Sequence, residues 1–240
     1  MLLQLAARLL WPARCAACNA FVPEDRAFCE SCAYSVSGVE QACDGCGLPR
    51  AVDSDGKDRR CHGCQTRPLP FSRVWTVLAY GGATTQAILH LKHGRRRCLA
   101  RPLGALLAPA VAAAMEDGVN ALCPVPLHPR RLRQRGFNQA LDLLRVAERL
   151  AGRPAVRALV VPDGLRRIRD TPALGWESPA SRRRIVAGAF ALRRPQWAKD
   201  RRILLLDDVM TTGATLAECA RVLLGAGAAE VQVVALARVA

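Results

Sequence analysis

The fold is decided by one stretch of the chain, which reads Ile203-Leu204-Leu205-Leu206-Asp207-Asp208-Val209-Met210-Thr211-Thr212-Gly213-Ala214-Thr215. Its leading apolar residues predict a buried strand, and two carboxylates follow them. The small residues after the carboxylates predict a tight turn into a helix that begins near Ala214. Backbone amides, threonine hydroxyls and a helix start are donors that suit a phosphate. We therefore expect residues 211–215 to hold a phosphate, while Asp207 and Asp208 accept hydrogen bonds from sugar hydroxyls.

The elements around this stretch predict an α/β fold. Apolar residues recur at helical spacing over 84–93, 102–115, 138–151 and 214–226. Short apolar runs between them predict strands over 74–80, 119–125, 155–161, 202–207 and 230–237. Strands that alternate with helices form a parallel sheet with helices on both faces, and ligands bind at the carboxyl ends of its strands. The predicted site at the end of strand 202–207 is in that position.

The stretch 203–215 resembles the PRPP-binding motif of type I phosphoribosyltransferases, in which a strand, two acids and a T-T-G-x-T loop follow one another. The resemblance implies that Asp207 and Asp208 are the catalytic carboxylates, holding the ribose. The 5-phosphate would bind at the loop, which consists of Thr211, Thr212, Gly213, Ala214 and Thr215. It also implies that PRPP binds together with Mg²⁺.

The cysteines predict a separate metal-binding segment. Eight of the eleven lie before residue 65, in four C-x2-C pairs, and this spacing is typical of structural zinc sites. The pairs are Cys15 with Cys18, Cys29 with Cys32, Cys43 with Cys46, and Cys61 with Cys64. We expect two four-cysteine zinc sites, with sequential pairing slightly favoured over a cross-braced one by the loop lengths. Disulfides are the alternative, which a reducing cytosol disfavours.

The remaining cysteines, Cys98, Cys123 and Cys219, stand alone in or beside apolar stretches and are expected to be buried small hydrophobic residues. The composition changes after residue 70. We therefore divide the chain into a cysteine-rich double zinc-binding module over 1–70 and a phosphoribosyltransferase-like domain over 71–240.

The charge also divides the chain. The net charge is +15, from 35 Lys and Arg against 20 Asp and Glu, and the first 70 residues are neutral. The excess after residue 70 is nearly all arginine and predicts an anionic ligand such as phosphate or nucleic acid, although a composition bias of the genome is the alternative. The longest apolar run, Leu103–Met115, contains Pro109 and is too short to span a membrane. Residues 1–11 lack a basic region and a cleavage site, so we expect a cytoplasmic protein.

A second resemblance covers nearly the whole chain. The run from Pro124 to His128, the run Arg133-Gln134-Arg135-Gly136-Phe137-Asn138-Gln139 and the paired cysteines are similar to the ComF/GntX family of competence-associated proteins. So are Tyr80-Gly81, Leu91-Lys92-His93-Gly94, Arg167-x-Arg169-Asp170-Thr171 and Gly188-Ala189-Phe190. The resemblance implies a zinc module, a phosphoribosyltransferase fold, and partners that include single-stranded DNA and other DNA-uptake proteins.

Residues 124–139 are expected to form a strand end, a basic loop and a helix start at Asn138. Guanidinium groups on that loop can neutralise a pyrophosphate, with help from the preceding helix. The candidate residues are Lys92, Arg130, Arg131, Arg133 and Arg135. Residues 162–187 are expected to form a long lid loop. The lid carries Leu174 and Ile185 where the family has Gln and Asn.

Three functions are consistent with the sequence. The chain is a phosphoribosyltransferase that releases pyrophosphate from PRPP, a PRPP-binding accessory protein that engages single-stranded DNA, or a PRPP sensor without turnover. The acceptor base is not indicated by any segment.

Overall fold

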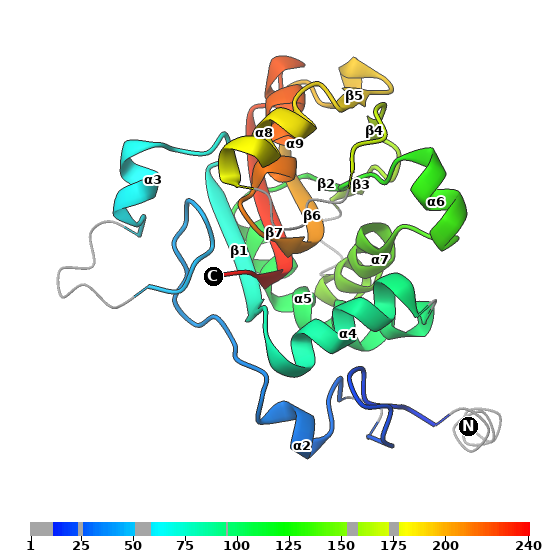
Figure 1. Cartoon of the computed structure of the whole chain (residues 1–240). Helices are drawn as coiled ribbons and strands as arrows, with labels where there is room; N and C mark the ends of the chain where they lie inside the picture. Colours follow the sequence, from blue (N-terminus) through cyan, green and yellow to red (C-terminus); the bar gives the residue numbers. More distant parts are fainter. Residues whose placement is uncertain (1–11, 24–25, 51–58, 95, 153–157, 173–177) are drawn as a thin grey trace.

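The computed structural model describes residues 12–23, 26–50, 59–94, 96–152, 158–172 and 178–240. Its centre is a five-stranded sheet, ordered β1-β7-β6-β2-β3, in which every neighbouring pair is parallel (Figure 1). The strands are β1 (Arg73–Ala79), β2 (Ala121–Pro124), β3 (Leu159–Val160), β6 (Arg202–Met210) and β7 (Glu230–Arg238). The predicted parallel α/β fold is confirmed. Residues 155–157 of the third predicted strand lie outside the described residues.

Helices cover both faces of the sheet, as Figure 1 shows. One face carries α4 (Gly82–His93), α5 (Ala100–Glu116) and α7 (Gln139–Ala151), and the other carries α9 (Ala214–Gly225). Successive side chains of a strand point to opposite faces. Accordingly, Leu204 and Leu206 pack into the core beneath α4, α5 and α7, whereas Ile203 and Leu205 pack beneath α9. The apolar run before Asp207 therefore supplies two cores.

The helix α5 is part of a long apolar segment. With the short 3-10 helix η1 (Arg97–Leu99), it forms a 20-residue run that is long and apolar enough to cross a membrane by length and composition alone. Half of the most apolar 18-residue window in that run is buried inside the fold, and Leu103, Leu107 and Val111 have no exposed surface. Its apolar side chains are those of a core helix. Residues 1–11, on which the signal-peptide prediction rests, lie outside the described residues.

The basic stretch after β2 is a helix, α6 (Pro129–Arg135), and the prediction of a loop there was wrong. Pro129 occupies the first turn, His128 Nδ1 accepts a hydrogen bond from the Arg130 amide, and Gly136 ends the helix at φ +84°. Proline at the start and a left-handed glycine at the end are helix-boundary signals. Sequence periodicity missed the helix because its polar residues give no apolar stripe.

The predicted lid loop is also partly regular structure. Within residues 162–187 the chain forms β4 (Leu165–Arg167) and α8 (Pro179–Val186), and β4 pairs antiparallel with β5 (Phe190–Leu192). A further 3-10 helix, η2 (Pro195–Trp197), leads to β6. Leu174 lies outside the described residues. Ile185 lies on α8, and its carbonyl accepts a hydrogen bond from Arg169 at 2.7 Å.

The cysteine-rich segment contains two short helices, α2 (Glu30–Ala33) and α3 (His62–Thr66), and runs along the edge of the sheet (Figure 1). Ser35 Oγ accepts a hydrogen bond from the Ala83 amide at the start of α4. Gly38 forms a bridge to Leu78 of β1, and the Ala79 amide donates to the Ser37 carbonyl at 2.8 Å. The segment between the two cysteine sites is thus bonded to β1.

Candidate functional site

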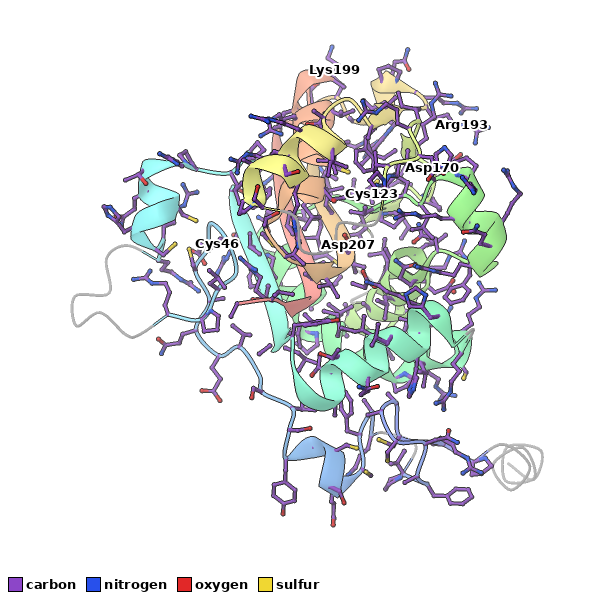
Figure 2. All side chains as sticks on the ribbon, in the orientation of Figure 1. Cys46, Cys123, Asp170, Arg193, Lys199 and Asp207 are labelled. Atoms are coloured by element: carbon purple, nitrogen blue, oxygen red, sulfur yellow. The ribbon has the colours of Figure 1, made fainter. Side chains whose placement is uncertain are left out.

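The two carboxylates near the carboxyl end of β6 have different surroundings. Asp208 is 3% exposed and faces α4, where its Oδ2 lies 2.8 Å from Lys92 Nζ. Asp207, which Figure 2 labels, accepts a hydrogen bond from the Asp208 amide at 2.9 Å and lines a hollow at the carboxyl end of the strand. Only one of the two carboxylates therefore lines this hollow, while the other is bound by a lysine.

The pKa values of this group follow from burial and the short ion pair. Burial alone would raise the pKa of Asp208, but the Lys92 ammonium outweighs it and holds that pKa below the usual range. Burial lowers the pKa of Lys92, and the Asp208 carboxylate more than compensates, so it is raised. Burial and the neighbouring Asp208 charge raise the pKa of Asp207 well above its usual value. A cation or a hydroxyl group of a ligand in the hollow would therefore stabilise the charged form of the Asp207 carboxyl group.

The turn after β6 has the geometry expected for a phosphate. Gly213 has φ +74° and precedes the first turn of α9, whose backbone amides point toward the hollow as at any helix start. Thr212 Oγ1 is buried and has no hydrogen-bond partner among the described residues. The hollow is small, with a cavity volume of about 20 Å³, and is lined by Asp207 together with residues 209–216. A buried hydroxyl without a partner fits a site whose ligand supplies the missing oxygen.

Arg182 is a site residue that the sequence did not reveal. It lies on α8, where its Nη1 donates to Thr211 Oγ1 at 2.5 Å. In the sequence Arg182 is only one of the many arginines after residue 70, because the position of α8 over the loop depends on the tertiary fold. The local signal for this helix was Ser178 followed by Pro179, an N-cap and a first-turn proline.

The candidate pyrophosphate residues are distributed over two places. Arg135 is half-buried, bonds Gln139 Oε1 at 2.6 Å and faces the charges of Asp207 and Asp208. Arg131 donates to the Thr171 carbonyl at 2.7 Å, and Arg130 pairs with Asp170 at 3.4 Å.

The second place is a groove between α6 and the segment after β4. It has a volume of about 430 Å³ and is lined by Arg130, Arg131, Gln134, Asp170, Thr171 and Pro172. Arg133 is exposed on α6 and is absent from the lining of both hollows.

The eight paired cysteines form two compact groups. One consists of Cys15, Cys18, Cys29 and Cys32, and the other of Cys43, Cys46, Cys61 and Cys64, with the ligand atoms of each within 4.8 Å of one another. Two of the sulfur pairs are 3.5 and 3.7 Å apart, near the roughly 3.8 Å expected around a tetrahedral zinc ion. The sequential pairing that the loop lengths favoured is confirmed.

The backbone also supports the second group, since the Cys61 amide donates to Cys43 Sγ at 3.1 Å. Of the unpaired cysteines, Cys123 and Cys219 are fully buried, as predicted. Cys98 is exposed, so its predicted burial was wrong. It lies in the turn η1, where Leu99 takes the inward position.

Comparison with known proteins gives the same two parts. Residues 6–65 match the double zinc ribbon domain, and residues 163–240 match the phosphoribosyl transferase domain. The DNA utilization protein YhgH of Escherichia coli O157:H7 is 35% identical over 217 residues, 88% of this chain and 89% of that protein. Competence protein F of Haemophilus influenzae is 36% identical over about half of each chain, and competence protein ComFC of Bacillus subtilis is 26% identical over 85% of this chain and 81% of its own length.

This chain belongs to the ComF family. In this ComF-family chain, the two groups of four cysteines are the ligand sets of the double zinc ribbon, and the hollow after β6 lies within the phosphoribosyl transferase match. The resemblance that the sequence motifs carried is therefore confirmed at the level of family, fold and zinc site.

Proposed function

We propose that this protein binds PRPP at the carboxyl end of β6 and transfers its phosphoribosyl group, with release of pyrophosphate, in a DNA-uptake or DNA-utilisation process. The observation that carries the proposal is the hollow at the start of α9, where the buried Thr212 hydroxyl has no partner among the described residues and Asp207 stands beside it. Groups that donate hydrogen bonds to a phosphate therefore lie next to a carboxylate that accepts hydrogen bonds from a sugar. The names of the relatives support the biological setting.

In this proposal the 5-phosphate is held by the loop Thr211, Thr212, Gly213, Ala214 and Thr215. Arg182 adds a guanidinium at Thr211. Asp207 accepts hydrogen bonds from the ribose hydroxyls, and Asp208 acts beside it while Lys92 balances its charge. The two carboxylates therefore act in positioning and in charge stabilisation.

The pyrophosphate carries about three negative charges, which guanidinium groups neutralise through bidentate contacts. Lys92, Arg130, Arg131, Arg133 and Arg135 remain the proposed residues. Arg135 has the main role among them, because it is half-buried and faces the carboxylate pair, whereas the Lys92 charge is already used by Asp208. Mg²⁺ bound to PRPP, mostly through substrate oxygens and water, supplies further charge neutralisation.

In the transfer step the lone pair of an acceptor nitrogen on a base forms a bond to C1′ of the ribose. The bond from C1′ to the pyrophosphate oxygen breaks, and pyrophosphate leaves with that electron pair. The ring passes through an oxocarbenium-like state, which the nearby Asp207 carboxylate stabilises electrostatically. The acceptor nitrogen then loses its proton to solvent.

A second function is a non-catalytic, cytoplasmic PRPP-binding protein that engages single-stranded DNA together with other competence proteins. The observation that favours it is the surplus of positive charge, +15 for the chain, of which Arg133, Arg183 and Arg184 are exposed on α6 and α8. Exposed cations of this kind bind a phosphate backbone without base readout.

Calorimetry with PRPP and Mg²⁺ tests the proposal. Asp207→Asn should weaken binding by about tenfold or more, since loss of a charge-assisted hydrogen bond costs roughly 1.5–3 kcal/mol. Asp163→Asn is the matched control, because Asp163 is exposed and pairs with Arg193 away from the hollow. A wild-type protein that binds no PRPP would refute the proposal.

Pyrophosphate release then separates the two functions. It is measured with a set of candidate bases, with and without a single-stranded oligonucleotide. Release that depends on a base identifies a transferase. Binding of both PRPP and the oligonucleotide without release with any base, in its presence or absence, identifies the accessory protein.

A further inference from the structure

Arg238 is a buried arginine that joins the second cysteine site to the phosphate loop. It lies at the end of β7 and is 8% exposed. Its Nε donates to the Cys46 carbonyl at 2.7 Å, and its Nη1 donates to the carbonyls of Met210, at 3.3 Å, and Val239. Cys46 is a ligand of the second site, and Met210 is the residue directly before Thr211. One planar guanidinium therefore holds both backbones.

Electrostatics favours this position for a cation. A zinc ion with four thiolates carries a net charge of about −2, which a low-dielectric environment leaves poorly screened. The Arg238 guanidinium donates to the backbone of Cys46 and therefore lies next to this set of thiolates. Arg238 is thus the buried counter-charge of the second cysteine site.

An apolar contact runs parallel to this polar one. Leu69 packs against the group of Cys43, Cys46 and Cys64 and also against the core beneath α9. A side chain at Gly213 would lie 3.4 Å from Leu69 Cδ1, so this leucine is directly behind the phosphate loop. Leu69 therefore lies between the cysteine site and the phosphate loop.

The second site is also attached to the sheet itself. Thr76 Oγ1 donates to the Gly47 carbonyl at 2.8 Å, and the Val74 amide donates to the Asp44 carbonyl at 2.8 Å. Both acceptors lie beside Cys43 and Cys46, and β1 is the neighbour of β7. Figure 2 shows Cys46 across β1 from Asp207. The site is thus hydrogen-bonded to the edge strand of the sheet.

The first cysteine site offers an internal comparison. Its contacts, within the described part of the chain, run to α4: the Ala16 carbonyl lies 3.0 Å from His90 Nδ1, and Cys15 packs in the core beneath that helix. The two sites thus contact different parts of the protein. A coupling that depends on Arg238 should involve the second site only.

We propose that the second cysteine site positions the phosphate loop through Arg238, so that zinc in this site and PRPP in the hollow strengthen each other's binding. The proposal rests on the proposed function of the hollow. Linkage requires the effect to be reciprocal: PRPP must slow zinc loss from the second site by stabilising the state in which zinc is bound. Partners that orient metal ligands from outside typically contribute tenfold to a hundredfold in metal affinity.

The experiment measures zinc release from the full chain to a colorimetric chelator, with and without saturating PRPP and Mg²⁺. Alkylation of the freed cysteines, mapped by mass spectrometry, assigns each zinc to its site. Arg238→Met removes the guanidinium group and its charge, and Arg238→Lys keeps the charge but not the planar guanidinium geometry. Arg202→Met is the matched control, because Arg202 pairs with Glu230 at the opposite end of the sheet.

We expect PRPP to slow zinc loss from the second site about tenfold and to leave the first site unchanged. Arg238→Met should release the second zinc about tenfold faster, weaken PRPP binding about tenfold and abolish the protection, with Arg238→Lys intermediate. Wild-type protein that binds PRPP without any change in zinc release, or with equal slowing at both sites, would overturn the coupling. Calorimetry with PRPP tests the proposed function separately, because absence of PRPP binding in the wild type would refute that function and not the coupling. If Arg238→Met does not fold, the effect of PRPP on zinc release from the second site of the wild-type protein still tests the coupling.

Discussion

Replacement of Lys92 by methionine removes the cation that pairs with Asp208 and keeps most of the length of the side chain. The pair is 2.8 Å long and Asp208 is 3% exposed, so the variant leaves a carboxylate buried without its partner. Breaking a buried pair in this way costs about 3–5 kcal/mol. We expect the lower end, about 3 kcal/mol, because the Lys92 side chain is 22% exposed and Arg135 remains nearby. The melting temperature should then fall by roughly 6–12 °C.

The loss should depend on pH with a definite sign. In the wild type the pKa of Asp208 is lowered, so this pair stabilises the fold above the unfolded pKa and the contribution is lost as pH falls through the folded pKa. Without Lys92, burial raises that pKa, so the native state binds the extra proton and its stability falls as pH rises above about 4. The difference between the two proteins should therefore be larger at about pH 8 than at about pH 5.

Urea denaturation at both pH values measures the difference. The double variant Lys92→Met with Asp208→Asn has no charge at either of these two positions and should regain most of the lost stability. Lys199→Met is the control, since Lys199 is exposed ahead of β6, and it should stay within about 0.5 kcal/mol of wild type (Figure 2). An equal loss at both pH values, or a double variant as unstable as the single one, would show that the effect arises from packing and would refute the electrostatic reasoning.

Four further outcomes are expected. Thr212→Val should weaken PRPP binding about tenfold in calorimetry without lowering the melting temperature, because the buried hydroxyl has no partner among the described residues; unchanged affinity would exclude its role. Gly213→Ala should lower the free energy of unfolding by about 1–2 kcal/mol in urea, since φ is +74° and the new Cβ would lie 2.8 Å from Met210 Cε. Metal analysis of gently purified protein should find two zinc ions, and fewer than one per chain would contradict the two cysteine sites. For binding of a single-stranded oligonucleotide, the slope of log affinity against log salt concentration should be about −0.7 per neutralised phosphate, and Arg184→Glu, at an exposed position on α8, should make that slope less steep while PRPP affinity stays the same. If the oligonucleotide does not bind at low salt, the DNA-binding function is refuted, and the excess of arginine after residue 70 is explained by the composition of the genome.

Several local features could be read directly from the sequence. The run Ile203–Leu206 predicted a buried strand because four consecutive apolar residues fit a strand covered on both faces, and β6 is covered in this way. The C-x2-C spacing predicted the ligand sets because two residues between sulfurs fix one tight turn, which is a local property. The order of these motifs along the chain was sufficient for the family and the fold.

Short polar helices were less predictable. The helix α6 has strong boundary signals at Pro129 and Gly136 but no apolar stripe, since its polar residues cover a surface. The position of α8 over the phosphate loop, which brings Arg182 to Thr211, follows from packing against α9 and from no local pattern.

The sequence by itself determined the elements that depend on short-range geometry: the strand with its carboxylates, the glycine turn and the cysteine pairs. The tertiary structure alone decided which charges meet. Lys92 and Asp208 are 116 positions apart and Arg238 and Cys46 are 192 apart, yet each pair is in contact. Parallel strands bring distant segments to one edge of a sheet, and burial there makes each charge depend on its partner. For this reason the sequence indicated the phosphate loop, whereas its link to the second cysteine site through Arg238 emerged only from the packed sheet.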